Sequence, residues 1–202
     1  CMYIETGKHK ILFDLGPDKL FLENAEKMGV KIEDVDTVVI SHGHYDHGGA
    51  LGLFLQRNRR AKVYLHRRAF EKHFSKALCL YINIGLDESL AGNGQIVFTE
   101  GNLELDDELT ILTDVKEREL YPLSNSNLYM LDGRKKVRDD FSHEQSLLIR
   151  EGEHRVLLAG CAHCGIVNIL NKAKRDMGGD ATHVIGGFHI WKDKSPETVR
   201  DL

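Results

Sequence analysis

The stretch SHGHYDHGGA, residues 41–50, follows directly on the short apolar run VDTVVI at 35–40. Such a run predicts a strand that is buried on both faces, and loops at the carboxyl ends of such strands converge on ligand sites in α/β sheets. Three imidazoles and one carboxylate lie between His42 and His47. Because imidazole binds zinc and iron and a carboxylate compensates the charge of a cation, the stretch indicates a metal site.

The spacing of these side chains suits two ions. In an extended chain His42 and His44 point the same way, so both can bind one ion. Asp46 and His47 lie on the following turn and can face a second ion. Gly43 permits a tight backbone path that a larger residue would block. The chain has 11 histidines in 202 residues, and this unusual number also favours metal binding.

The overall composition excludes several classes of protein. Apolar residues make up 42% of the chain and charged residues 29%, which is typical of a globular domain with a sizeable core. The net charge of −4 argues against a nucleic acid partner. No apolar run reaches the roughly 20 residues that a membrane helix needs. No basic leader with an apolar segment is present, so no secretion signal is expected.

The cysteine positions also bear on the cellular setting. The four cysteines, at positions 1, 79, 161 and 164, match no disulfide framework of a small secreted protein. They predict a reducing, cytoplasmic setting. Cys161 and Cys164 form a CxxC pair, but the sequence has no second pair to complete a four-thiolate zinc site.

Strands and helices alternate along the chain, which favours a layered α/β or α+β domain over 1–202 without an internal linker. The apolar periodicity predicts helices at 20–28, 50–57, 67–78 and 166–177. It predicts strands at 1–6, 10–15, 35–40, 62–65, 96–99, 103–105, 109–112, 127–131, 145–149, 156–159 and 184–185. The glycine-rich segment 85–94 and the charged segment 132–140 are expected to be loops, the second a mobile one.

Four motifs together resemble the metallo-β-lactamase-fold superfamily. They are SHGHYDHGGA, which matches the HxHxDH signature of the superfamily, the preceding ILFDLG at 11–16, GCAHCGIVN at 160–168 and GGFHI at 186–190. The last two are similar to the subgroup of 7,8-dihydropterin-6-methyl-4-(β-D-ribofuranosyl)aminobenzene 5'-phosphate synthase-like proteins. The resemblance implies a four-layer αβ/βα sandwich. Against such a fold, the domain is expected to be truncated at both ends.

The resemblance also implies a site with two divalent metal ions between the sheets, with zinc expected and iron or manganese as alternatives. In the pattern of the superfamily, one ion is bound by His42, His44 and a later histidine. The second ion is bound by Asp46, His47 and the last histidine of the pattern, which matches His189. Cys161 stands where a bridging ligand is expected, and the resemblance gives Asp14 the role of orienting the loop that carries the ligands.

Two residues compete for the place of the later histidine. His163 lies in GCAHCG, and His143 lies in FSHEQ before the strand predicted at 145–149. His163 is the preferred ligand and His143 the alternative, with Glu144 as a further candidate. The histidines outside these motifs are interpreted as ordinary surface or strand-end residues: His9, His66, His73, His154 and His183.

The function implied is a metal-dependent hydrolase in which Asp46 is the catalytic residue and helps to orient the attacking water. A small phosphorylated metabolite or a phosphodiester is the expected substrate, with neither nucleic acid nor membrane as a partner. The alternative is a synthase-like condensation of a pterin with an aminobenzene ribofuranosyl phosphate. Two further alternatives are a metal-bound redox protein, against which His44 argues because such relatives commonly carry Glu there, and a non-catalytic sensor.

Overall fold

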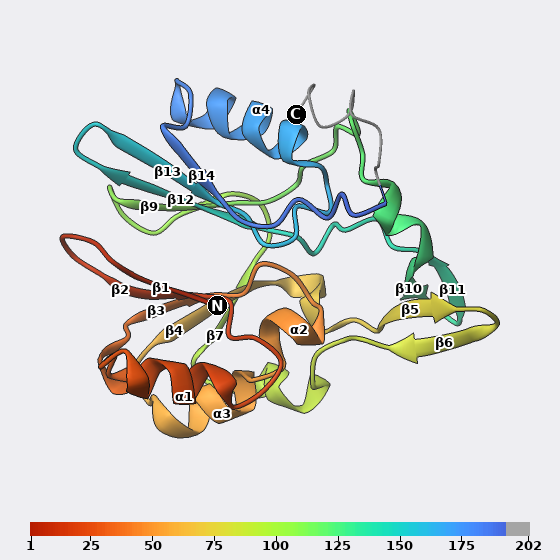
Figure 1. The fold of residues 1–202 in the computed structure, drawn as a ribbon, viewed down its shortest axis with the longest axis horizontal. Coiled ribbons are helices and arrows are strands. Elements are labelled where there is room, and N and C mark those ends of the chain that lie inside the picture. Colours follow the sequence, from red (N-terminus) through yellow and green to blue (C-terminus); the bar gives the residue numbers. More distant parts are fainter. Residues whose placement is uncertain (193–202) are drawn as a thin grey trace.

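The computed structural model describes residues 1–192 and places two five-stranded sheets face to face, with helices on their outer sides (Figure 1). The first sheet has the order β1 (Met2–Glu5), β2 (Lys10–Phe13), β3 (Thr37–Val39), β4 (Lys62–His66) and β7 (Ile96–Thr99). The helices α1 (Leu20–Lys27) and α3 (Leu51–Arg57) cover its outer face. The resulting α/β sandwich confirms the predicted fold class.

The second sheet has the order β14 (His183–Ile185), β13 (His154–Leu158), β12 (Ser146–Glu151), β9 (Leu109–Leu112) and β8 (Leu103–Glu104). The helix α4 (Ile166–Met177) covers its outer face. A third, four-stranded sheet projects from the sandwich and has the order β11 (Lys135–Arg138), β10 (Leu128–Asp132), β5 (His73–Ala77) and β6 (Leu80–Asn83). The short helix α2 (Tyr45–Gly48) begins within the histidine-rich stretch.

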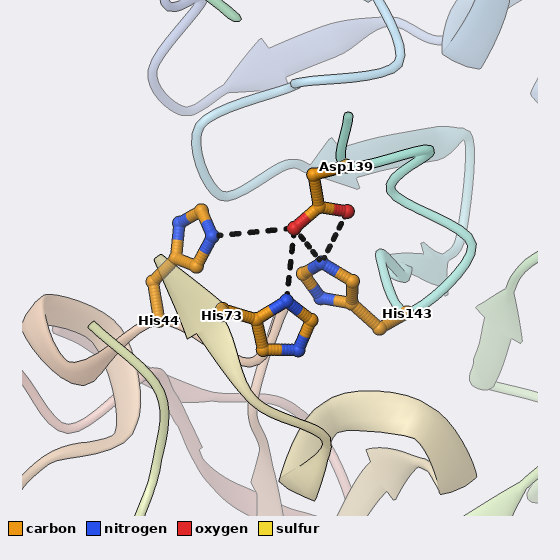
Figure 2. Close-up of side chains that lie close together, drawn as sticks. All are labelled: His44, His73, Asp139 and His143. Atoms are coloured by element: carbon orange, nitrogen blue, oxygen red, sulfur yellow. Dashed lines mark hydrogen bonds and ion pairs between the residues drawn. The ribbon is translucent and has the colours of Figure 1, made fainter. Parts of the chain in front are cut away.

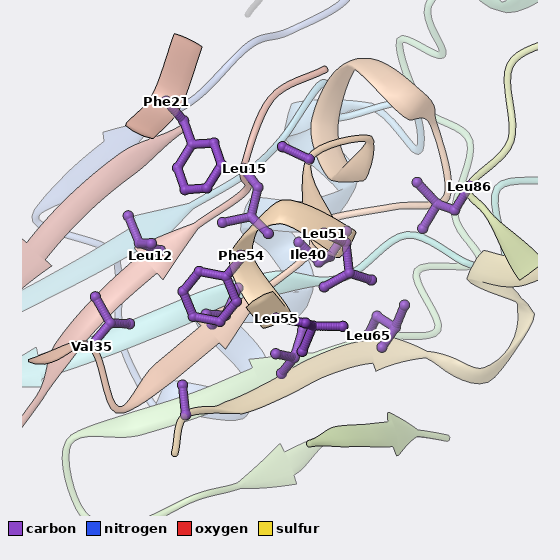
Figure 3. Close-up of a cluster of buried hydrophobic side chains, with 14 of the residues drawn as sticks. Leu12, Leu15, Phe21, Val35, Ile40, Leu51, Phe54, Leu55, Leu65 and Leu86 are labelled. Atoms are coloured by element: carbon purple, nitrogen blue, oxygen red, sulfur yellow. The ribbon is translucent and has the colours of Figure 1, made fainter. Parts of the chain in front are cut away.

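Alternation along the strands sorts the apolar side chains into three buried layers. In β2, Leu12 packs toward α1 and α3, whereas Ile11 and Phe13 face the other sheet. In β12, Leu148 packs toward α4 and Leu147 faces the first sheet. Figure 3 shows the layer beneath the first sheet, where Leu12, Phe21, Phe54 and other side chains fill the space between strands and helices.

The order and direction of the strands bring the motifs to one end of the sandwich. β2 and β3 are parallel, so Asp14 and the stretch that begins at Ser41 follow their strands at the same edge. In the second sheet β13 and β14 are also parallel, and residues 160–164 and 186–189 follow them. Gln145 joins the two sheets there, because its backbone N–H donates to Ser41 O at 2.7 Å and its amide donates to Ile40 O at 2.8 Å.

Two predicted elements are wrong. Residues 67–78 are a short 3₁₀ turn at Arg67–Phe70 followed by β5, and the predicted helix is absent. In β5, Phe74 and its neighbours alternate between two faces and pair with both β10 and β6, so tertiary pairing overrides the helical spacing. The predicted loop at 132–140 contains β11, which forms a hairpin with β10 across Gly133 at φ 59°. Among residues 1–192, no helix has the length and hydropathy to cross a membrane.

Candidate metal centre

The histidines of the HxHxDH stretch lie against residues from the second sheet at the shared end of the sandwich. The ring centroid of His42 is 4.5 Å from that of His44, 4.2 Å from that of His47 and 4.8 Å from that of His163. Two groups of side chains hold their ligand atoms within 4.8 Å of one another: His42, His44 and His163 form one group, and His42, His47 and Cys161 form the other.

Hydrogen bonds determine which nitrogen of His42 and His47 faces this centre. Ser41 Oγ donates to Asp14 Oδ2 at 2.9 Å, so it accepts the Nδ1 proton of His42, also at 2.9 Å. Asp14 Oδ2 accepts the Nδ1 proton of His47 at 2.7 Å. Nε2 of each ring is therefore directed to the centre: that of His42 has no hydrogen-bond partner within the described chain, and that of His47 is 3.1 Å from Cys161 Sγ.

His163 shows the same arrangement with a different partner. Asn125 donates from Nδ2 to the His163 carbonyl at 2.8 Å, which fixes the orientation of its amide, and Asn125 Oδ1 accepts from His163 Nδ1 at 2.8 Å. Nε2 of His163 is buried and finds no hydrogen-bond partner among residues 1–192. A buried nitrogen without a partner is costly, and a metal ion is a partner that satisfies it.

Glu144 forms hydrogen bonds with the backbone of the loop that carries His163. Its carboxylate accepts the backbone N–H of His163 at 2.6 Å and that of Cys164 at 2.8 Å, and burial raises the pKa of Glu144. Both oxygens are thus engaged with the loop, and Glu144 is outside both groups of converging ligand atoms. The sequence offered Glu144 as a candidate ligand, and the structure places it as a support of the loop at 163–164.

Burial and mutual repulsion keep three of the imidazoles neutral. Burial, followed by the charges that neighbouring histidines would carry, holds the pKa of His42, His44 and His163 well below the ordinary value. For His47 burial acts in the same direction, but hydrogen bonds with Asp14 and Cys161 outweigh it and raise its pKa to about 11. Neutral imidazole is the form that binds metal.

Asp46, Cys161 and His189 lie at the mouth of the centre. They line a cavity of about 210 Å³ together with His44, Tyr45, Ser75, Ile84, Leu128 and His163. The Asp46 side chain is 54% exposed and its Oδ2 is 3.7 Å from His47 Nε2. The ring of His189 is 4.3 Å from that of His163, and its backbone has φ 48°. Asp46 and His189 therefore lie at the rim of the centre, outside the two groups of converging ligand atoms.

His143 lies behind the centre with both of its nitrogens occupied. The backbone N–H of Gly43 donates to His143 Nδ1 at 2.9 Å, and His143 Nε2 is 3.2 Å from Asp139 Oδ1. Asp139 also accepts from His73 Nδ1 at 2.8 Å, as Figure 2 shows. We call His73, Asp139 and His143 the Asp139 cluster. Its ligand atoms, with that of His44, also lie within 4.8 Å of one another.

Sequence reasoning missed several members of this region. His73 was interpreted as a surface or strand-end residue, whereas it is fully buried. It lies in no motif, and β5, which the sequence pattern did not predict, brings it to Asp139. Asn125 and Asp139 lie in no motif that could identify them. The only available signal was Ser41 inside the histidine-rich stretch, next to the first ligand.

Comparison with known proteins agrees with the fold and the motifs. The sequence model of the Metallo-beta-lactamase superfamily matches residues 1–189. An uncharacterized protein of Methanocaldococcus jannaschii, MJ0448, is 28% identical over 188 residues, which are 93% of this chain and 70% of that protein. The 7,8-dihydropterin-6-methyl-4-(β-D-ribofuranosyl)-aminobenzene-5'-phosphate synthase of the same organism is 26% identical over 194 residues, 91% of this chain and 66% of that protein.

Solved structures show the same relationship. Tm1679, described as a metal-dependent hydrolase of the β-lactamase superfamily, has 31% sequence identity and a TM-score of 0.78 over 95% of this chain and 70% of that one. A quorum-quenching N-acyl homoserine lactone lactonase shares 16% of the sequence with a TM-score of 0.57, over 95% of this chain and 80% of that one. The second likeness concerns the fold alone.

Proposed function

The chain belongs to the metallo-β-lactamase superfamily, and on that premise we propose that it is a metal-dependent hydrolase. The observation that supports this most directly is the convergence of buried ring nitrogens. In both His42 and His163, Nδ1 forms a hydrogen bond with a protein partner. Nε2 of each ring has no hydrogen-bond partner in the described chain and points toward the same centre. Rings held in this way are typical of metal ligands, whose other nitrogen is fixed by an outer hydrogen bond.

The donor set fits two divalent ions, of which zinc is the proposed identity. His42, His44 and His163 would hold the first ion. Asp46, His47 and His189 would hold the second, with Cys161 between the two. Imidazole and thiolate donors favour zinc over magnesium or calcium, and His47 would release the proton on Nε2 in order to bind. His143 is left out of this set because both of its nitrogens have partners.

Divalent ions in such a site supply Lewis acidity, which polarises a phosphoryl or carbonyl oxygen and lowers the pKa of water. The protein orients the metal ligands and the attacking water, and it supplies a carboxylate that can accept a hydrogen bond from that water. Asp14 and Ser41 hold His42 and His47 in position through the hydrogen bonds described above. The carboxylate of Asp46, half-exposed at the mouth of the cavity, can accept a hydrogen bond from the attacking water and orient it.

The cavity suggests what part of a substrate reaches the centre. Its volume of about 210 Å³ is smaller than the roughly 300–1,000 Å³ of pockets that enclose drug-sized ligands. It therefore suits the reacting group of a substrate, with the remainder extending outward. Ser75 can donate a hydrogen bond to that group, whereas Ile84 and Leu128 provide apolar walls. A small phosphate ester or phosphodiester is the proposed substrate class, and the net charge of −4 disfavours a polyanionic macromolecule.

The test is elemental analysis of protein purified without chelator, followed by hydrolysis of bis(p-nitrophenyl) phosphate. We expect near-stoichiometric transition metal and activity that chelation removes and added metal restores. His42→Gln should lose both metal and activity. His154→Gln changes an exposed histidine on β13 and serves as the control that keeps both. Wild-type protein without bound metal would contradict the proposal.

A second candidate is a condensation of the kind named for the synthase relative, which is 26% identical over 91% of this chain. Such a reaction would use the same metal ligands to activate an oxygen for bond formation. Bound metal together with failure to hydrolyse any phosphodiester would favour this candidate. Product formation from a pterin and an aminobenzene ribofuranosyl phosphate would then be the assay to run.

A further inference from the structure

The Asp139 cluster is a second group of buried titratable side chains that the proposed reaction does not use. The Asp139 side chain has no exposed surface, and neither do those of His73 and His143. Asp139 Oδ2 is 2.8 Å from His73 Nδ1 and 4.0 Å from His44 Nε2. Asp139 Oδ1 is also fixed by the backbone N–H of Phe141 at 2.9 Å. Complete burial of a carboxylate is costly in free energy unless the carboxylate is paired and hydrogen-bonded.

The hydrogen bond from Gly43 determines where the protons of this cluster lie. Because the Gly43 N–H donates to His143 Nδ1, Nδ1 carries the lone pair and the proton of the neutral ring is on Nε2, where it faces Asp139. A metal ion on Nε2 would move that proton to Nδ1, opposite the N–H of Gly43, so that two donors would face each other. The cluster is therefore a hydrogen-bonded network, even though its atoms lie close enough together to bind an ion.

The network reaches the HxHxDH stretch at the residue between its first two histidines. Gly43 is held on one side by His143 and packs closely on the other. A Cβ at Gly43 would lie 2.3 Å from Ala69 O and 2.9 Å from His73 Nε2, a nitrogen for which the described residues offer no hydrogen-bond partner. The backbone at Gly43 thus leaves no room for a side chain, and the ring of His44 lies next to Asp139, as Figure 2 shows.

From this geometry we infer that Asp139 is a positioning residue of the metal centre. It holds His73 and His143 directly, it fixes the backbone at Gly43 through His143, and its Oδ2 lies 4.0 Å from His44 Nε2, which has no hydrogen-bond partner among residues 1–192. The inference rests on the proposed metal site. At that site the Asp139 cluster orients His44 and the peptide that joins His44 to His42.

The first test is Asp139→Asn, with Asp140→Asn as its matched control. Asp140 is the neighbouring carboxylate, but its side chain is 55% exposed, pairs with Arg68 at 3.4 Å and accepts from Ser142, and it makes no hydrogen bond with a histidine among residues 1–192. Removing outer partners of metal-binding histidines typically lowers metal affinity about 10–100-fold. We expect that loss of zinc affinity in Asp139→Asn, measured by competition with a chromophoric chelator, and wild-type affinity in Asp140→Asn.

The second readout is the visible spectrum of the cobalt(II)-loaded protein at saturating cobalt. A residue that only supported folding would leave the spectrum of the bound ion unchanged, whereas loss of orientation at His44 should alter the band positions or intensities. Equal affinity and equal spectra for wild type and Asp139→Asn would overturn the inference while leaving the proposed function intact. A wild-type protein that binds no metal would instead refute the proposed function, and the inference with it.

A third measurement needs no variant, and so it applies even if Asp139→Asn does not fold. Long-range ¹H–¹⁵N NMR of the histidine rings in metal-free wild-type protein reports which nitrogen carries the proton. We expect His143 to carry it on Nε2 and His73 on Nδ1, the nitrogens that face Asp139. A proton on Nδ1 of His143 would contradict the hydrogen bond from Gly43 and overturn the inference.

Discussion

Two groups of titratable side chains lie side by side in this protein, and His163 of the first group differs from His143 of the second in what its second nitrogen meets. The first is the part of the proposed donor set whose ligand atoms converge, and we call it the ligand set: His42, His44, His47, Cys161 and His163. In its members His42 and His163, one nitrogen is fixed by a hydrogen bond and the other has no hydrogen-bond partner within residues 1–192. In the Asp139 cluster, His143 has a partner on both nitrogens, whereas His73 has one on Nδ1 only. His42 and His163 are as completely buried as His143, so burial alone does not identify a ligand.

The difference shows how one fold uses imidazole in two ways. A ring with one nitrogen fixed and the other open presents a lone pair in a known direction, which is the requirement of a metal ligand. A ring engaged on both sides transmits position from one part of the chain to another. His143 connects a carboxylate on the segment after β11 to the backbone of Gly43, and this connection is what separates it from His163.

The largest expected effect is therefore a difference between His163→Gln and His143→Gln. We expect His163→Gln to lose metal affinity by more than the roughly 100-fold that an outer-partner substitution costs, because a direct ligand is removed. Gln at 143 keeps an N–H group that can reach Asp139, so His143→Gln should retain stoichiometric metal. Elemental analysis and chelator competition on both variants measure the contrast. Loss of metal from His143→Gln with retention in His163→Gln would reverse the two roles.

The next effect concerns Asp14, the partner that fixes the ligand set. Its carboxylate accepts the backbone N–H of Ser41 at 2.7 Å as well as the Ser41 hydroxyl and His47 Nδ1. Asp14 has φ 60°, a conformation that Asn also tolerates, so Asp14→Asn changes one acceptor into a donor without backbone strain. We expect metal affinity to fall about 10–100-fold.

The control for this variant is Asp18→Asn, in the exposed segment before α1. Asp18 is exposed and accepts the backbone N–H of Leu20, a residue outside the centre, so the metal affinity of Asp18→Asn should match that of wild type. Equal metal affinities for wild type, Asp14→Asn and Asp18→Asn would show that Asp14 does not orient the ligand set.

The sequence was sufficient for those parts of the fold in which local pattern and tertiary packing agree. The helix predicted at 166–177 is α4, and the hairpin of β1 and β2 lies where alternation predicted it. The HxHxDH stretch could be interpreted because its ligands are close in the chain. Asp139 could not be identified in this way, because its partner His73 is 66 residues away.

The two incorrect elements fail for a related reason. The segment 132–140 is charged, which favours a loop, but β11 stacks its cations over aromatic rings of neighbouring strands. Lys136 Nζ is 4.9 Å from the ring centre of Phe74, and the Arg138 guanidinium is 4.5 Å from that of Tyr129. Such contacts stabilise a charged strand, and they depend on side chains distant in sequence. Gly133, at the first position of the two-residue turn at 133–134, was the local hairpin signal.

A smaller effect is expected at Glu144, which supports the ligand set but does not touch its ring nitrogens. Glu144→Gln leaves one of the N–H groups of His163 and Cys164 facing an NH₂ group. An unsatisfied buried donor costs about 1–3 kcal/mol, and each kcal/mol lowers the melting temperature of a domain of this size by about 2–4 °C. Thermal unfolding of metal-free protein measures the loss. An unchanged melting temperature would show that the carboxylate is dispensable, and Glu153→Gln, on the exposed turn between β12 and β13, is the control.

The smallest effect separates both groups from a third kind of histidine, which is partly exposed and paired with two carboxylates. Partial burial disfavours the charged form of His9, but hydrogen bonds with Asp106 and Asp36 outweigh it and raise its pKa above the ordinary value. A raised folded-state pKa stabilises the fold below about pH 6.5, and this stabilisation is lost as the pH rises through the folded value. His9→Gln should therefore lower the free energy of unfolding by about 1 kcal/mol at most near pH 5.5 and by less near pH 9. Urea unfolding at both pH values measures the difference, and a loss that is equal at both would mean that the charge of His9 contributes nothing.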